Sequence, residues 1–234
     1  PYAATVQGIL QKTEQEGATT TITGNNFSVT FNNGMLRGYT VNGTSMLAAP
    51  LQLNAFRLPI DNERGRAGNY DRMGLRNLKL TTTQLETTLS KDKQTATVTI
   101  TNKYKSEGES SFVMRQVIDV LADGVLVINA TIDPQPKNRE LPRIGLRTEM
   151  PAGFENMCWL GRGPHDSYVD RKESAHVGLY HSRVSDEWTN YVLPQEQGNK
   201  EEVRWMAITN DAGQGLMVVA PERIAASVGH WRPE

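Results

Sequence analysis

Short runs of alternating apolar and polar residues, many of them β-branched, follow one another along nearly the whole chain. Alternation with a period of two is typical of strands that bury one face. We expect strands at 19–23, 27–31, 36–41, 78–89, 95–101, 112–121, 125–132, 144–149, 203–209 and 216–220. The pattern predicts an all-β fold.

Turn dipeptides lie between several of these strands, at Asn33-Gly34, Asn42-Gly43 and Asp123-Gly124. Asn and Gly accept the positive φ that tight hairpins require, so each dipeptide predicts an antiparallel reversal. The reversal at Asp123-Gly124 joins two long strands that must bury one face together. This hairpin favours a large antiparallel β-sandwich over a small barrel.

Helical signals are weak. Residues 6–15 fit either a short helix or a linker that leads into a strand, and we assign 1–18 to a linker from an upstream domain. The stretches 50–76 and 151–202 are irregular and rich in turn residues, which is typical of binding loops. We therefore expect one β domain over 19–234, with its function in these two stretches.

The composition is that of an ordinary globular protein, with 38% hydrophobic and 22% charged residues among 234. A net charge of −1 argues against nucleic acid and anionic membranes as partners. No apolar run reaches the length of a membrane-spanning helix. Because the chain begins at Pro1 without a leader, we expect it to be a piece of a longer polypeptide.

A single cysteine, Cys158, excludes an internal disulfide and a cysteine-based zinc site. It adjoins Trp159 in an apolar strand, which predicts a buried, unreactive thiol. The histidines lack the close spacing of metal ligands, and no phosphate-binding or nucleophile motif is present. We expect no cofactor in this chain.

Candidate site residues fall in three clusters. The first, at 58–65, contains Asp61 and Asn62, which suit sugar hydroxyls or a partner loop. An Asx turn with a solvated ion pair is the alternative.

The second cluster follows a Gly-x-Gly-Pro turn and comprises His165, Asp166, Tyr168, Asp170 and Arg171. A ligand or partner surface, ordering of the loop, and acid–base catalysis are its three interpretations. Because neighbours in a strand point to opposite faces, we do not expect His165 and Asp166 to form a dyad.

The third cluster contains Trp188, Tyr191 and Glu196. Its polar groups suit hydroxyls, and its aromatic faces, with that of Trp205, suit stacking against a pyranose ring. For Trp205 the alternative is a place in the core strand 203–209.

Several of these stretches resemble, in order, the C-terminal fifth or small-chain domain of bacterial β-galactosidases of glycoside hydrolase family 2. The resemblance is clearest in Trp-Leu-Gly-Arg-Gly-Pro (159–164) followed by Tyr168 and Asp170-Arg171. The remaining matches are 24–36, Pro-Ile-Asp-Asn-Glu-Arg-Gly (59–65), Arg-Ile-Gly-Leu (143–146) and Tyr-Val-Leu-Pro-Gln-Glu-Gln-Gly (191–198). Glu63 stands where the family usually has Asp, and the family's domain continues past Glu234.

The resemblance implies a galactose-mutarotase-like β supersandwich, truncated at its C-terminal end. It implies a non-catalytic domain that walls the sugar pocket of a β-galactosidase and helps to assemble it. The two glutamates of the retaining reaction would lie on an upstream barrel domain, as would any divalent cation such as Mg²⁺. The implied partners are that barrel domain, a β-galactoside substrate and further copies of the full-length enzyme.

Two other functions fit the residues. A free-standing aldose 1-epimerase needs an acid and a base, for which His165 or His176 with Glu196 are the candidates. A carbohydrate-binding module would use Trp188, Tyr191 and Asp61. The cellular location is left open by the sequence.

Overall fold

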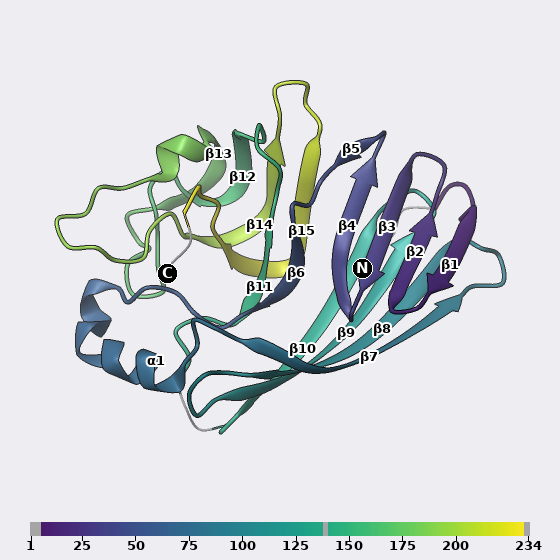
Figure 1. The fold of residues 1–234 in the computed structure, drawn as a ribbon. Coiled ribbons are helices and arrows are strands. Elements are labelled where there is room, and N and C mark those ends of the chain that lie inside the picture. Colours follow the sequence, from purple (N-terminus) through teal and green to yellow (C-terminus); the bar gives the residue numbers. More distant parts are fainter. Residues whose placement is uncertain (1–5, 138–139, 232–234) are drawn as a thin grey trace. The chain divides into compact units, whose positions relative to one another are not determined.

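The computed structural model describes residues 6–137 and 140–231, which form two compact units (Figure 1). Within the described residues, the larger unit comprises 6–56 and 65–151, and the smaller comprises 57–64 and 152–231. Both are built from antiparallel sheets, so the all-β prediction is confirmed.

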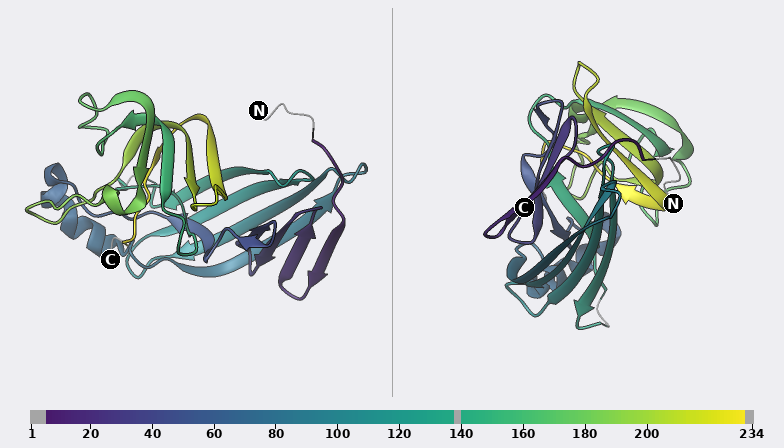
Figure 2. Two further views of the ribbon diagram at one scale, coloured as in Figure 1. Left: turned by 90° about the horizontal axis from the view of Figure 1, so that it is seen from above. Right: turned by 90° about the vertical axis from the view of Figure 1, so that its right-hand side faces the viewer.

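The larger unit contains three sheets. One has the order β1-β2-β3-β4-β5, the second β10-β9-β8-β7, and the third pairs β11 with β6. The strands are β1 (Lys12–Glu16), β2 (Thr19–Thr23), β3 (Phe27–Asn32), β4 (Met35–Val41), β5 (Thr44–Ser45), β6 (Ala49–Asn54), β7 (Lys79–Leu89), β8 (Thr95–Lys105), β9 (Ser111–Leu121), β10 (Leu126–Gln135) and β11 (Gly145–Glu149). The elongated sheets of this unit are seen from two further sides in Figure 2.

The core of the larger unit lies between its two larger sheets. Val29 and Phe31 of β3 are fully buried, as are Val98 and Ile100 of β8 and Ile118 of β9, and all belong to one hydrophobic cluster. Intervening residues of β3 are only partly buried, which is the alternation that the sequence shows. The predicted β-sandwich is confirmed.

The predicted hairpin turns are present. At Asn33-Gly34 the φ angles are 48° and 69°, and at Asn42-Gly43 they are 50° and 78°. Both central residues have positive φ, as tight hairpin turns with the strand's own twist require. These turns set the register of β3 with β4 and of β4 with β5.

The smaller unit has one sheet in the order β13-β12-β14-β15. Its strands are β12 (Asn156–Gly163), β13 (His176–Arg183), β14 (Lys200–Thr209) and β15 (Gly215–Ala226), with the 3-10 helix η2 (Val184–Glu187) after β13. Trp159 is 1% exposed, and Met157 and Val203 are buried with it. Trp205 lies in the strand β14, as its core-strand interpretation predicts, but its side chain is only half-buried.

Two predictions of irregular structure are only partly confirmed, because regular elements interrupt the loops. The stretch 50–76 contains β6, the 3-10 helix η1 (Asp61–Arg66) and the helix α1 (Ala67–Met73). The stretch 151–202 contains β12, β13 and η2. The strand β13 could not be predicted because all its residues are partly or fully exposed, so its sequence shows no alternation of apolar and polar residues.

Of the two alternatives for residues 6–15, the structure shows the segment that leads into a strand. Residues 6–11 form no helix, and 12–16 form β1, which pairs with β2 along its length. The sequence of β1 is polar, and each of its residues is exposed. An edge strand of this kind gives no periodic signal, because neither face is buried. In the described part of the chain, no helix has the length and apolar character to span a bilayer.

Candidate functional site: three interlocked loops

The three predicted clusters meet in the smaller unit. They lie on the segments 57–64, 164–171 and 188–199, which we call the loop cluster. The second segment leaves the end of β12 and the third runs from the end of η2 into β14. Sequence reasoning identified the clusters but not that they contact one another.

The first and third segments are joined through backbone groups. The amide of Leu58 donates to Oε2 of Glu196 over 2.9 Å, and the amide of Asp61 donates to Oε1 of Gln195 over 3.2 Å. The amide of Glu196 donates in return to the carbonyl of Pro59. Glu196 is 6% exposed, so its carboxylate is a buried anchor for the first segment.

The second and third segments are joined by a triangle of side chains. One carboxylate oxygen of Asp166 lies 2.9 Å from Nη2 of Arg171, and the other accepts from the hydroxyl of Tyr191 over 2.7 Å. Arg171 also donates to that hydroxyl over 2.9 Å. Burial raises the pKa of Tyr191; the hydrogen bond from Arg171 opposes this rise and the adjacent Asp166 adds to it, and the net pKa lies above the ordinary value. The phenol therefore stays protonated and keeps its hydrogen bond to Asp166 at neutral pH.

Tyr168 lies in the interior of the cluster and is 6% exposed. Its backbone pairs with that of Arg171 in both directions, which closes a tight turn over Val169 and Asp170. Burial raises the pKa of the Tyr168 phenol, and the negative charges of Asp166 and Glu196 raise it further. Tyr168 is thus a neutral, structural side chain.

The first and second segments are joined by Asn62, whose amide donates to Oδ2 of Asp170 over 2.6 Å. The first segment is also braced internally, because the guanidinium of Arg57 contacts both carboxylate oxygens of Glu63 at 2.6 and 2.8 Å. These side chains are only 13% and 20% exposed. Asp61 and Arg64 form a second, exposed pair at 2.6 Å, which matches the solvated ion pair of the alternative interpretation.

His165 and Asp166 do not form a dyad, as the alternation argument predicts. Nε2 of His165 lies 3.0 Å from Oγ of Ser174, whereas Asp166 contacts Arg171 and Tyr191. His165 is therefore at the edge of the loop cluster.

Trp188 is 56% exposed and lies edge-on to Trp231, with ring centroids 5.1 Å apart. Cys158 is half-buried rather than fully buried, because its strand β12 has only one inward face. Burial nevertheless raises the pKa of the Cys158 thiol, which keeps it protonated at neutral pH.

Sequence reasoning missed several residues that hold the loops in place. Ser167 exchanges hydrogen bonds with Asn199, and the amide of Glu201 donates to the Ser167 hydroxyl over 3.0 Å. Lys200 and Glu187 form a buried ion pair beneath the same loops. The burial of Lys200 could not be predicted from the sequence, because lysine is almost never fully buried unless it is paired, and its partner Glu187 is not adjacent in the chain.

The chemistry of the cluster is dominated by internal pairing. Each carboxylate named in it contacts a donor of the same unit, as the preceding distances show. Across the described residues, no three His, Cys, Asp or Glu side chains are grouped so as to hold a metal ion.

Comparisons with known proteins agree on one family. Residues 23–234 match a protein-family model whose description is "Beta galactosidase small chain". The chain is 31% identical over 207 residues to a beta-galactosidase of Priestia megaterium, covering 88% of this chain and 20% of that protein. It is 26% identical over 212 residues to a beta-galactosidase of Vibrio cholerae, covering 85% and 20%. The chain therefore spans about a fifth of the length of these two relatives.

Proposed function

Because this chain belongs to the β-galactosidase small-chain family, we propose that it is a non-catalytic part of a β-galactosidase that hydrolyses terminal β-D-galactosides. Its relatives bear the name beta-galactosidase and extend far beyond the matched part. In this proposal the catalytic glutamates, and any Mg²⁺, belong to an upstream barrel domain. The chain contributes a wall of the sugar pocket and contacts for assembly of the enzyme, including its oligomer.

One observation carries the proposal: the carboxylates of the loop cluster accept hydrogen bonds from groups that hold the loops in place. A general acid or base must exchange a proton with the substrate. Asp166 instead holds Arg171 and Tyr191, and the buried Glu196 holds the amide of Leu58. Groups engaged in this way keep a loop surface in one shape, which suits a wall against substrate or a neighbouring domain.

The test uses the full-length enzyme that contains this chain. We expect Asp166→Asn and Glu196→Gln to lower kcat for a nitrophenyl β-galactoside by less than about tenfold, with a larger effect on KM or on stability. Loss of a true acid–base group costs roughly 10²–10⁴-fold in rate. A loss of that size in a folded variant, at saturating substrate, would contradict the proposal.

A carbohydrate-binding module is the second candidate, and the exposed face of Trp188 favours it. Under that function the isolated chain binds galactosides without converting them, and Trp188→Ala abolishes binding. Polarimetry of freshly dissolved α-galactose separates both functions from an aldose 1-epimerase. Accelerated anomerisation that is lost in His165→Ala would overturn the non-catalytic assignment.

A further inference from the structure

The chain has two Asn-Gly dipeptides, and both form two-residue turns of the larger unit: Asn33-Gly34 joins β3 to β4, and Asn42-Gly43 joins β4 to β5. An Asn-Gly pair carries its own electrophile and nucleophile, because the backbone nitrogen of the glycine can attack the side-chain carbonyl carbon of the asparagine. Glycine has no Cβ to obstruct this approach. The two turns share this chemistry and differ in their surroundings.

The attack requires rotation about the bonds of the asparagine, so its rate depends on how easily each turn opens. The turn at Asn33-Gly34 is held by the residues around its glycine. Gly34 is buried, and its carbonyl accepts from Nδ2 of Asn102 over 2.8 Å. A Cβ on Gly34 would overlap the Thr83 hydroxyl, so the backbone has no room to turn here.

The strands on either side of Asn33-Gly34 belong to the core. Phe31 of β3 and Leu36 of β4 pair with each other in register and are buried in the hydrophobic cluster. The carboxamide of Asn33 is tied as well, since its Nδ2 donates to Oδ1 of Asn32 over 2.9 Å. Opening this turn therefore disrupts buried packing and costs a large part of the stability of the unit.

The turn at Asn42-Gly43 has open surroundings. Both residues are exposed, and a Cβ on Gly43 would meet no atom within 4 Å. The strand that follows, β5, has two residues and lies at the edge of its sheet. Beyond it the chain is fixed again at Met46, which is 2% exposed and donates from its amide to the carbonyl of Tyr39 over 2.7 Å. Opening this turn therefore disturbs only one short edge strand.

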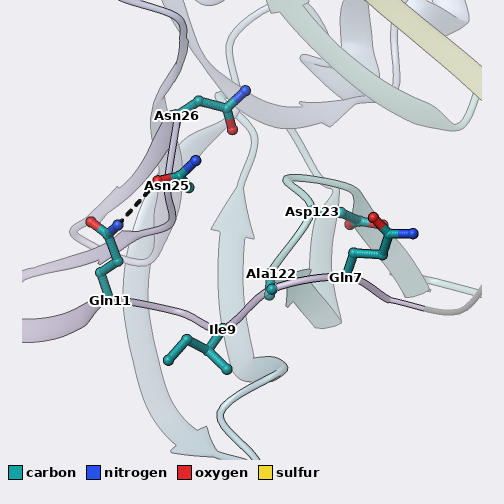
Figure 3. Close-up of a pocket in the computed structure, with 8 residues that line it drawn as sticks. Gln7, Ile9, Gln11, Asn25, Asn26, Ala122 and Asp123 are labelled. Atoms are coloured by element: carbon teal, nitrogen blue, oxygen red, sulfur yellow. Dashed lines mark hydrogen bonds between the residues drawn. The ribbon is translucent and has the colours of Figure 1, made fainter.

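A backbone hydrogen bond reaches this turn from another part of the unit. The amide of Asn42 donates to the carbonyl of Asn26 over 2.7 Å. Asn26 is itself exposed, in the β2–β3 turn beside an open hollow (Figure 3). Water competes for a bond between two exposed turns, so this bond is a weak restraint. It also leaves out the nucleophile, which is the amide of Gly43.

We propose that Asn42 is a site of spontaneous deamidation through a succinimide, whereas Asn33 in the matching turn is protected. The backbone nitrogen of Gly43 loses its proton to hydroxide and forms a bond to Cγ of Asn42. The side-chain nitrogen takes a proton from water and leaves as ammonia. Water then opens the ring at either carbonyl, which yields aspartate or isoaspartate. Isoaspartate adds a main-chain carbon to a turn whose length fixes the register of β4 with β5.

Peptide mapping of the full-length enzyme that contains this chain tests the proposal, because trypsin places the two dipeptides in separate peptides, 13–37 and 38–57. The native enzyme is incubated at mildly alkaline pH, and mass spectrometry follows the replacement of the side-chain NH₂ by OH at each asparagine. Asn42 should convert at least about tenfold faster than Asn33, because its turn opens locally. In guanidinium chloride both turns are unfolded, and the two rates should become similar.

The variant Gly43→Ala tests the route. It adds a methyl group beside the nucleophile, so in guanidinium chloride the rate at Asn42 should fall several-fold while the rate at Asn33 is unchanged. An equal rate at Asn42 in this variant would show that the glycine nitrogen is not the nucleophile, which would overturn the proposal.

Two results with the native enzyme would also overturn it, namely an Asn42 that stays intact and an Asn33 that converts as fast as Asn42. Circular dichroism verifies that the enzyme stays folded throughout the incubation. The readout is independent of galactoside hydrolysis, so failure here leaves the proposed function intact.

Discussion

Lys200 and Glu187 form an ion pair of 2.6 Å between Nζ and Oε2, with side chains only 2% and 5% exposed. Nζ of Lys200 also donates to the carbonyl of Pro164 over 2.9 Å and lies 5.0 Å from the ring centre of Trp159. The pair thus ties η2, the start of β14 and the turn after β12 together beneath the loop cluster.

Removing one member of this pair should destabilise the smaller unit strongly. We expect Lys200→Met to lower the free energy of unfolding by about 3–5 kcal/mol, because it leaves the Glu187 carboxylate buried without its cation. Denaturant titration measures the change. The double variant Lys200→Met/Glu187→Met should lose less than Lys200→Met alone. Equal or greater loss in the double variant would show that the pairing is not the cause.

Gly74 and Gly108 approach each other closely in the larger unit, at the end of α1 and in the β8–β9 turn. A Cβ on Gly74 would overlap the backbone nitrogen of Gly108, and Gly74 has φ of 65°. We expect Gly74→Ala to destabilise the unit by about 1–3 kcal/mol, measured by thermal or denaturant unfolding. Gly68→Ala is the control, because it lies in α1 with open space around it and should stabilise by about 0.5–1 kcal/mol. Equal changes in stability for Gly74→Ala and Gly68→Ala would show that the close approach of Gly74 to Gly108 does not limit the residue at position 74.

Glu202 gives stability a defined dependence on pH. Its hydrogen bond with Arg162, and then that with Lys172, lower the pKa of its carboxyl below the ordinary value of 4.5. A carboxyl with a lowered pKa stabilises the folded state above that ordinary value, and the stabilisation disappears as pH falls through the folded-state pKa. Glu202→Gln should therefore be less stable than the wild type at pH 7, with a difference that shrinks on acidification. A difference that is constant from pH 7 to pH 3 would contradict this account.

Tyr191→Phe tests the triangle in the loop cluster. The change removes one hydroxyl that accepts from Arg171 and donates to Asp166, and we expect a loss of about 1–3 kcal/mol in unfolding free energy. Val192→Ala, at a neighbouring side chain that is 99% exposed, should change stability by less than about 0.5 kcal/mol. A Tyr191→Phe variant as stable as Val192→Ala would show that the triangle is not ordered in solution.

Strands with one buried face were predictable from the sequence because burial imposes a period of two. The predicted 19–23 coincides with β2, and the predicted 112–121 falls within β9. The polar edge strand β1 and the half-exposed β13 escaped detection, since their backbones pair without an apolar face to mark them. The helix η1 also gives no apolar periodicity in the sequence. It is held by side-chain contacts such as those between Arg57 and Glu63.

By itself, the sequence determined the all-β class, the hairpin turns, the family resemblance and the membership of the three polar clusters. These follow from local properties, namely side-chain alternation, the φ preferences of Asn and Gly, and the order of short motifs. Only the tertiary structure decided that the three segments that carry Asp61, Asp166 and Glu196 are joined to one another by hydrogen bonds. Hydrogen bonds such as Leu58 to Glu196 join residues far apart in the chain, and their distances are set by packing, which no local pattern encodes.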